Sequence, residues 1–201
     1  MIELYTSNTP NGYKASIMLE EIGLPYTVHK IDLTAGDQGK LEFLEINPNG
    51  KIPAIVDGAL SRRVFESGAI LIYLAEKSGR FLPQDPGART ETLAWLFLQA
   101  ASIGPMLGQL WHFRGVKPAV SYAINRYEKE AYRLYGVLDG QLASHRHMAG
   151  DAYTIADIAT WPWIRLHQAL GLDVAPYPNV RRWLDEIAAR PAVQKGITIP
   201  A

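Results

Sequence analysis

The 201-residue sequence contains no cysteine. This absence excludes disulfide bonds, thiolate metal ligands and a cysteine nucleophile on the protein, so any sulfur chemistry must use the sulfur of a ligand. Net charge is also lacking, because 20 Lys and Arg balance 20 Asp and Glu. A chain without net charge has no long-range field that attracts phosphate backbones or anionic membranes, so nucleic acid is not an expected partner.

Long apolar runs are missing as well. The first ten residues, MIELYTSNTP, hold neither a basic stretch nor an apolar run, and no segment offers about 18 consecutive apolar residues for a membrane span. We therefore expect a soluble, cytoplasmic protein without membrane contacts.

Conventional cofactor motifs are absent too. The five histidines show no paired metal-ligand spacing, and we expect His145 and His147 to lie on a solvated surface beside a loop. Neither a Walker lysine loop nor a dinucleotide glycine fingerprint occurs. The sequence therefore predicts no metal and no phosphate-cradling loop.

Short strands and helices alternate in the first part of the chain, residues 1–80. Apolar periodicity and turn residues predict strands at Ile2–Thr6, Tyr26–Asp32, Ala54–Asp57 and Arg62–Phe65, and helices near Asn11–Ile22, Lys40–Ile46 and Ser67–Ser78. The order βαβαββα predicts an α/β domain with a four-stranded mixed sheet, whose last two strands pair antiparallel.

The second part of the chain is predicted to be all-helical. Residues 81–87 contain two prolines and a glycine and are typical of a linker, and residues 88–201 follow as the second domain. A capping box is expected at Thr154 and Asp157. Apolar residues recur every three or four positions along one long helix, at Val120, Ile124, Tyr127, Ala131, Leu134, Leu138 and Leu142.

Three segments of the first domain are expected at one edge of its sheet, where they would form a peptide-sized site. In the first, Thr9 and Asn11 surround the start of a helix. One interpretation is an ordinary capped helix, with Thr9 as N-cap and Pro10 in the first turn. The other is that the Thr9 hydroxyl and the Asn11 amide donate hydrogen bonds to a ligand sulfur, which would favour its anionic form.

The other two segments contain a proline before a strand and the start of a helix. A cis Ile52-Pro53 bond would leave the Ile52 backbone able to pair with an extended peptide, whereas a trans proline at the start of an edge strand is the commoner case. Glu66 suits an ammonium group, and the helix that begins near Ser67 suits a carboxylate. A plain N-cap explains Ser67 equally well.

These motifs together resemble the glutathione transferase superfamily. The resemblance rests on Asn47-Pro48-Asn49-Gly50-Lys51-Ile52-Pro53-Ala54, Phe65-Glu66-Ser67-Gly68-Ala69-Ile70 and Tyr153-Thr154-Ile155-Ala156-Asp157-Ile158, and it covers essentially the whole chain. It implies a thioredoxin-like N-terminal domain and a helical-bundle C-terminal domain. Thr9-Pro10-Asn11-Gly12 and Gly104-Pro105-Met106-Leu107-Gly108-Gln109 look most like the bacterial Nu class and its fungal nitrogen-regulator relatives.

The resemblance also implies roles for individual residues. Thr9 and Asn11 would contact the sulfur of glutathione, which serves as co-substrate. The other glutathione contacts would come from Glu66 and Ser67 at the γ-glutamyl head, Ile52 and the following Pro53 at the cysteinyl backbone, and Lys51 with Gln38 at the glycyl carboxylate. The catalytic tyrosine or serine of other classes has no clear counterpart here, because Tyr5 lies within a strand and Ser7 is only a reserve candidate for that role.

Further residues implied by the resemblance lie in the helical domain. Arg133 would approach the ligand, across a dimer interface or within the chain, although solvent exposure on a long helix is the simpler account. The second-substrate pocket would be walled by Met106, Trp111, His112 and Phe113, for which packing between the domains is an equally good explanation.

The function that the resemblance implies is glutathione-dependent disulfide reduction by a homodimer, with a small-molecule disulfide as substrate. Conjugation of glutathione to a small electrophile uses the same thiolate and is the first alternative. A regulatory protein that binds glutathione without turnover is the second.

Overall fold

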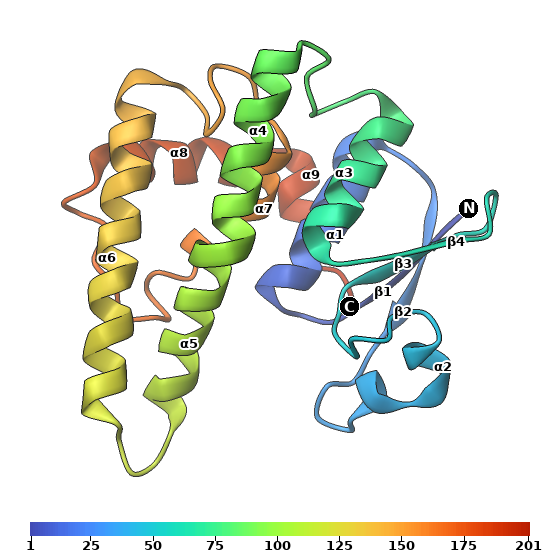
Figure 1. Ribbon diagram of the computed structural model, residues 1–201, viewed down its shortest axis with the longest axis horizontal. Coiled ribbons are helices and arrows are strands. Elements are labelled where there is room, and N and C mark those ends of the chain that lie inside the picture. The colour runs from blue at the N-terminus through green and yellow to red at the C-terminus, as the bar shows by residue number, and fades with distance from the viewer. The chain divides into compact units, whose positions relative to one another are not determined.

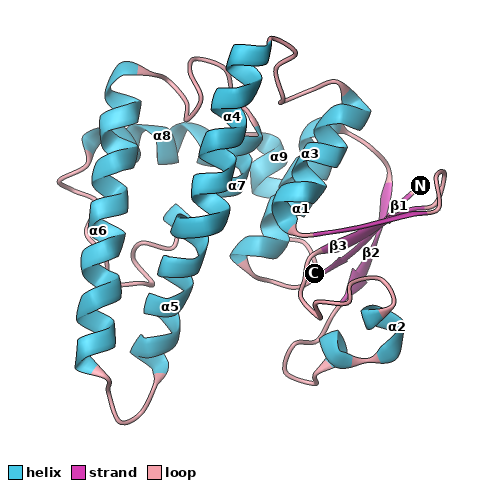
Figure 2. Cartoon of the chain, in the orientation of Figure 1, coloured by secondary structure: helices cyan, strands magenta, loops and turns pink.

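The computed structural model describes all 201 residues, which divide into two compact units. The first unit combines Met1–Leu82 with Ala188–Ala201, and the second is Pro83–Ile187. Figure 1 labels their helices and strands, and Figure 2 distinguishes the sheet of the first unit from the helices of the second.

The first unit is built on a four-stranded mixed sheet with strand order β2-β1-β3-β4. Strand β1 (Ile2–Thr6) pairs parallel with β2 (Tyr26–Lys30) and antiparallel with β3 (Ala54–Asp57), which pairs antiparallel with β4 (Arg62–Phe65). The predicted sheet is confirmed. Strand β2 ends before the predicted Asp32 because the Asp32 carboxylate accepts from the N–H groups of Thr34 and Ala35 and turns the chain there.

Two helices cover one face of this sheet, α1 (Pro10–Ile22) and α3 (Ser67–Ser78), as Figure 1 shows. They bury apolar side chains such as Met18 and Leu74 completely. The short α2 (Leu41–Leu44) follows a 3₁₀ turn, η1 (Asp37–Gly39), and is shorter than the helix predicted over residues 40–46. Its Phe43 packs with Ile31 and Ala54 in a separate small cluster.

The C-terminal helix α9 (Pro191–Gly196) returns to the first unit and packs on α1. Arg190 forms a bidentate ion pair with Glu21, at 2.6 and 2.8 Å, and the Ser16 hydroxyl donates to the carbonyl of Gly196 at 2.7 Å. A side chain at Gly196 would place its Cβ 2.7 Å from the Ile17 Cα, so only glycine allows this approach. Periodicity alone did not indicate this return, and the predicted boundaries at 1–80, 81–87 and 88–201 stay predictions.

The second unit is helical, as predicted. It contains α4 (Pro86–Leu98), a π turn η2 (Gln99–Ile103), α5 (Gly104–Gly115), α6 (Ser121–Ser144), α7 (Ile155–Ile164) and α8 (Pro178–Ala188). Figure 1 shows α5 and α6 side by side, which their close packing confirms. The predicted stripe of α6 is buried at Ala131, Leu134, Leu138 and Leu142, whereas Val120 is 40% exposed.

The run from Pro86 to Gly115 forms one continuous helix of 30 residues with a mean hydropathy of 1.2 in its most apolar window. By length and composition it could cross a membrane, unlike the expectation from the sequence. A helix of a soluble protein's core passes the same test, so the run is weak support for a membrane span.

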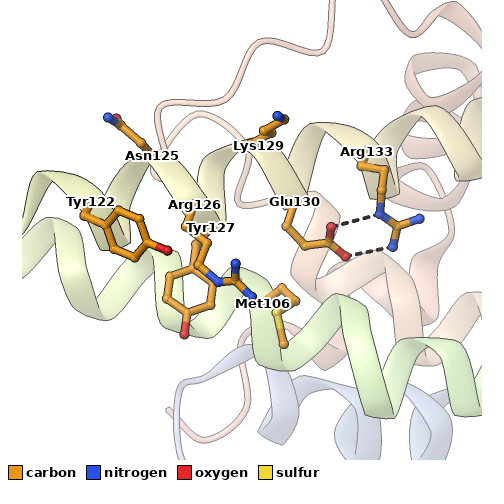
Figure 3. Close-up of a pocket in the computed structure, with 8 residues that line it drawn as sticks. All are labelled: Met106, Tyr122, Asn125, Arg126, Tyr127, Lys129, Glu130 and Arg133. Carbon is orange, nitrogen blue, oxygen red and sulfur yellow. Dashed lines mark hydrogen bonds and ion pairs between the residues drawn. The ribbon is translucent and has the colours of Figure 1, made fainter.

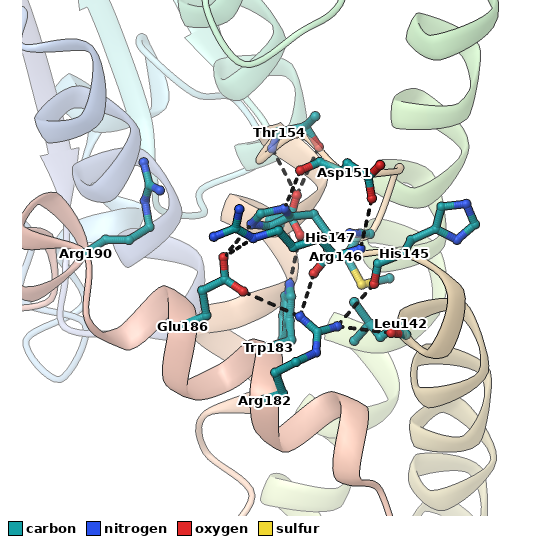
Figure 4. Close-up of polar contacts among 12 residues, drawn as sticks. Leu142, His145, Arg146, His147, Asp151, Thr154, Arg182, Trp183, Glu186 and Arg190 are labelled. Atoms are coloured by element: carbon teal, nitrogen blue, oxygen red, sulfur yellow. Dashed lines mark hydrogen bonds and ion pairs between the residues drawn. The ribbon is translucent and has the colours of Figure 1, made fainter.

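A buried carboxylate organises one end of the helical unit. Asp157 lies in the first turn of α7 and accepts from the backbone N–H groups of Met148 (2.9 Å) and Thr154 (3.0 Å) and from the Trp183 indole (2.8 Å). The predicted capping box with Thr154 is therefore confirmed. Arg182 lies nearby and donates to three carbonyls, among them that of Leu142, as Figure 4 shows.

The prediction for the two neighbouring histidines is wrong for one of them. His145 is exposed, but His147 is only 5% exposed, because its ring packs edge-on against Tyr153 and its Nδ1 lies 3.0 Å from the carbonyl of Asp151. Its Nε2 is 3.6 Å from the Glu186 carboxylate, a neighbour that is distant in sequence.

A second buried carboxylate ties the end of β3 to α3. Asp57 is 1% exposed and accepts from the Tyr73 hydroxyl at 2.5 Å, the Lys77 ammonium at 2.8 Å and the Ala59 N–H at 3.1 Å. The bonds from Lys77 and Tyr73 favour the ionised form and lower the pKa of Asp57 to about 2, despite its burial.

We expect Asp57→Asn to lower the free energy of unfolding by about 1–3 kcal/mol at pH 7, since the amide keeps the shape but loses charged hydrogen bonds. Because the folded pKa lies below the ordinary 3.8, the stabilisation is present above pH 4 and is lost as the pH falls toward about 2. Urea unfolding of both proteins at pH 7, 4 and 3 measures the difference. If the difference in the free energy of unfolding between the two proteins stays the same as the pH is lowered to 3, the stabilising role of the Asp57 carboxylate is contradicted.

Candidate active site

The sheet register brings three separate segments to one edge. Tyr5 lies opposite Ala54, and Ala54 lies opposite Phe65. The residues that follow β1, precede β3 and follow β4 therefore meet, as predicted from the sequence. They enclose a pocket of about 170 Å³ that is lined by Asn11, Asn47, Asn49, Lys51, Ile52, Pro53, Glu66 and Ser67.

The first segment is the start of α1. Thr9 is its N-cap, and the Thr9 Oγ1 accepts from the Gly12 N–H at 3.1 Å. Gly12 is required there, because a Cβ would lie 2.2 Å from the Ser7 carbonyl oxygen. The capping interpretation is thus confirmed, yet it leaves the Thr9 hydroxyl hydrogen available for donation. Asn11 lines the pocket, whereas Thr9 is not among the lining residues.

The second segment is the turn before β3, and Asn47 organises it. This side chain is 1% exposed, donates from Nδ2 to the Lys51 carbonyl at 2.5 Å and accepts from the Asn49 N–H at 3.0 Å. Gly50 has a left-handed φ of +62°, and the Ile52-Pro53 peptide bond is cis. Ile52 precedes β3 and lies outside the sheet ladder.

The third segment joins β4 to α3. Glu66 is the N-cap residue with a φ of +66°, a conformation that costs a side-chain-bearing residue about 1–3 kcal/mol. Its carboxylate accepts from the Asn49 side chain at 3.3 Å. Ser67 is the first residue of α3 and not its N-cap, so the plain capping explanation for Ser67 is wrong. Its Oγ accepts from the Lys14 ammonium at 3.3 Å.

These groups are arranged for a zwitterionic, extended ligand. The Glu66 carboxylate suits an ammonium, the N–H groups at the start of α3 suit a carboxylate, and the exposed Lys51 in the lining suits a second carboxylate. No group of three or more His, Cys, Asp or Glu residues that could hold a metal ion is present.

Not every predicted residue lines this pocket. Gln38 lies in η1, next to the turn at Gly50, and its buried Oε1 has no hydrogen-bond partner. The sequence reasoning missed Asn47 and Asn49 as lining residues, although both stand in the motif that it quoted. Tyr5 stacks on His29 at 4.5 Å, and burial together with Glu3 raises the pKa of its phenol, which disfavours a role as an ionised catalytic group.

The helical unit has a pocket of its own, drawn in Figure 3, with a volume of about 690 Å³. Arg133 binds the Glu130 carboxylate through two hydrogen bonds of 2.7 and 2.8 Å. The pocket includes two of the predicted residues, Met106 and Arg133. It is lined by Met106, Tyr122, Asn125, Arg126, Tyr127, Lys129, Glu130 and Arg133.

The remaining predicted pocket residues lie outside that lining. Trp111 is 55% exposed, and His112 packs edge-on against Phe113, which stacks on Tyr127 at 5.6 Å. Most of the residues that the prediction missed lie three or four positions apart along α6, as do Tyr122, Arg126 and Lys129. That helical spacing could have grouped them on one face.

The mixed sheet of this topology and the cis proline before β3 define a thioredoxin-like unit, which is combined with a helical second unit. The chain belongs to the glutathione S-transferase family. Residues 2–76 match the family model of the glutathione S-transferase N-terminal domain, and residues 109–191 match that of the C-terminal domain.

Similar proteins agree with this assignment. The disulfide-bond oxidoreductase YfcG of Escherichia coli is 47% identical over 203 residues, which cover 98% of this chain and 94% of YfcG. The disulfide-bond oxidoreductase YghU of the same organism is 49% identical, over 97% of this chain and 73% of YghU. A glutathione transferase family member from Pseudomonas fluorescens, crystallised with two glutathione molecules bound, superposes with a TM-score of 0.91 at 47% identity and covers 99% and 93% of the two chains.

We expect Asn47→Ala to reduce the affinity for glutathione about tenfold and to lower the free energy of unfolding by about 1–3 kcal/mol, because the Lys51 carbonyl and Asn49 N–H lose their buried partner. Titration calorimetry and urea unfolding measure the two effects. Asn8→Ala, at an exposed residue of the neighbouring loop, is the matched control. Unchanged affinity in the Asn47 variant would show that this turn does not shape the site.

Proposed function

We propose that the protein is a glutathione-dependent disulfide-bond reductase in which the sulfur of bound glutathione is the nucleophile. The observation that carries the proposal is a pocket beside the start of α1 in a chain that has no cysteine of its own. The names of YfcG and YghU as disulfide-bond oxidoreductases support the same reaction.

The chemistry of the pocket supports a place for each part of glutathione in this proposal. Glu66 takes the ammonium of the γ-glutamyl head, and Ser67 with the start of α3 takes its carboxylate. The Ile52 backbone pairs with the cysteinyl residue beside Pro53. Lys51, with Gln38 behind the turn, receives the glycyl carboxylate.

The cysteinyl sulfur then lies near the start of α1, where Thr9 and Asn11 donate hydrogen bonds to it. A thiol with a pKa of about 8.5 is mostly protonated at neutral pH, and donors aimed at the anion lower that pKa. The positive end of the α1 helix dipole acts in the same direction. Because only the thiolate attacks disulfides, this environment raises the fraction of bound glutathione that can react.

The reaction consists of two thiol–disulfide exchanges. The glutathione thiolate attacks one sulfur of the substrate disulfide, whose S–S bond breaks to give a glutathionyl mixed disulfide and a substrate thiolate, which takes a proton. A second glutathione thiolate attacks the glutathionyl sulfur of the mixed disulfide, forming glutathione disulfide and releasing the second substrate thiol. Two glutathione molecules are oxidised as one disulfide is reduced, and no bond to the protein forms.

The cationic pocket of the helical unit is proposed to contribute to binding the second substrate. Arg126, Lys129 and Arg133 outnumber the single carboxylate of Glu130, so the pocket favours an anionic disulfide. Met106 and Tyr127 provide apolar contact, and Trp111, His112 and Phe113 stay predictions as further walls.

Two other functions use the same glutathione site. Conjugation would require an apolar acceptor pocket, and the cationic lining at α6 favours an anionic substrate instead. A regulatory protein would bind glutathione without turnover. We further propose that the protein acts in the cytoplasm as a homodimer, as is typical of the family, with a solution mass of twice the 22.3 kDa of the chain.

Replacing both thiolate donors, Thr9→Ala with Asn11→Ala, should reduce kcat/KM for a small disulfide about a hundredfold, since the thiolate loses hydrogen bonds directed at its charge. Glutathione-coupled reduction of hydroxyethyl disulfide, with a parallel aryl halide assay for conjugation, measures the effect. Thr9→Ser keeps cap and hydroxyl, and Ser7→Ala removes only the reserve hydroxyl, so both should retain activity. Normal turnover by the folded double variant would contradict the assigned roles.

Arg133→Ala should raise KM for an anionic disulfide such as 3,3′-dithiodipropionate about two- to fivefold while leaving KM for the uncharged hydroxyethyl disulfide unchanged, because an exposed charge contributes about 1 kcal/mol or less. The exposed Arg181 of α8 lies outside the pocket lining, and Arg181→Ala is the matched control. If Arg133→Ala raises KM equally for the charged and the uncharged disulfide, Arg133 does not bind an anionic substrate.

A further inference from the structure

A buried lysine lies directly behind the pocket. Lys14 is one turn after Asn11 in α1, is 2% exposed and donates from its Nζ to the Ser67 Oγ at 3.3 Å. Lysine is among the residues least often buried, because removing its charge from water is costly. Ser67 itself lines the pocket, so one hydroxyl separates this cation from the ligand site.

The Glu66 carboxylate acts on Lys14. Glu66 precedes Ser67 at the start of α3, and its negative charge favours the protonated lysine. Burial has the larger, opposite effect and lowers the pKa of Lys14 to about 7. The amine of the empty pocket thus changes charge close to neutral pH.

The other charges on the elements packed against α1 have partners. On α3, Lys77 pairs with Asp57, and Glu76 is engaged as well. On α9, Arg190 pairs with Glu21 and Lys195 pairs with Glu20, both in the last turns of α1 and well away from its start. On β1, Glu3 is paired with a histidine of β2. A ligand carboxylate that reached Ser67 would therefore be a new negative charge for Lys14.

The hydrogen bond from Lys14 also fixes the orientation of the Ser67 hydroxyl. A protonated lysine has donors only, so the Ser67 oxygen must accept from it. The Ser67 hydroxyl hydrogen is then directed away from Lys14, and it can be donated to a carboxylate in the pocket. A serine without this partner could rotate its hydroxyl and offer a lone pair to the ligand instead.

We propose that Lys14 is a positioning residue that directs the Ser67 hydroxyl toward the α-carboxylate of bound glutathione and takes up a proton when that carboxylate binds. The inference rests on the proposed function, which places the γ-glutamyl head at Glu66 and Ser67. Lys14 acts through Ser67 and does not touch the ligand.

Proton uptake makes glutathione affinity depend on pH. Above pH 7 the lysine of the empty pocket is mostly neutral, whereas the bound carboxylate raises its pKa and keeps it charged. Binding must then draw a proton from solution, so affinity falls as the pH rises above about 7, by up to tenfold per pH unit for one full proton. Below pH 7 the lysine is already protonated and this dependence disappears.

Calorimetric titration with S-methylglutathione tests the inference, because this analogue keeps both carboxylates and the ammonium but has no thiol to ionise. At pH 7.5, titrations in two buffers of different ionisation enthalpy count the protons taken up. Wild-type protein should take up about half a proton or more per ligand. Lys14→Met should take up almost none and bind about tenfold more weakly, whereas Lys14→Arg should keep most of the affinity and also take up almost none.

Lys40→Met removes an exposed lysine from the same unit and should behave like wild type. The inference is overturned if wild-type protein binds the analogue without taking up protons, a measurement that requires no folded variant. It is also overturned if wild-type protein takes up no more protons than Lys14→Met does. Absence of binding to folded wild-type protein would instead overturn the proposed function itself.

Discussion

The antiparallel pairing of β3 with both β1 and β4 is the constraint on which the site depends. Because Tyr5 and Phe65 both lie level with Ala54, the end of β1, the beginning of β3 and the end of β4 share one edge of the sheet. A shift of one residue in this register would turn side chains to the opposite face and separate the three segments. The start of α1, the Asn47 turn and the start of α3 are polar loops held at that edge by strands with buried side chains such as Leu4 and Ile55.

The chemistry of the pocket follows from the absence of a protein thiol. The protein supplies hydrogen-bond donors, helix termini and two opposite charges, and the reactive sulfur belongs to the ligand in the function proposed here. Glu66 keeps a left-handed φ at the junction where it faces the pocket, and Lys14 is buried beneath it. Both features cost stability, and both surround Ser67, which is the pattern expected where binding and not folding sets the residue choice.

Each of the two units has a buried carboxylate that joins separate segments. Asp57 fixes the far end of β3 to α3, while Asp157 joins the start of α7 to Met148 and Trp183 in the helical unit. Each accepts several hydrogen bonds, which offset part of the cost of its burial. The α9 segment adds a third constraint, because the Glu21 ion pair with Arg190 fastens the C-terminus of the chain to the helix that begins at the site.

The sequence by itself determined the order of strands and helices, the α6 stripe, the capping box at Thr154 and the segments that form the pocket, since these depend on local periodicity and turn chemistry. Only the tertiary structure decided that His147 is buried, that residues 188–201 return to α1, that Arg126 and Lys129 share a pocket with Arg133, and that Lys14 lies under Ser67. Burial of a polar side chain and pairing between distant residues depend on which surfaces meet. Local spacing does not encode those contacts, because side chains such as Lys14 and Ser67 are 53 positions apart and become neighbours only when α1 and α3 pack on the same face of the sheet.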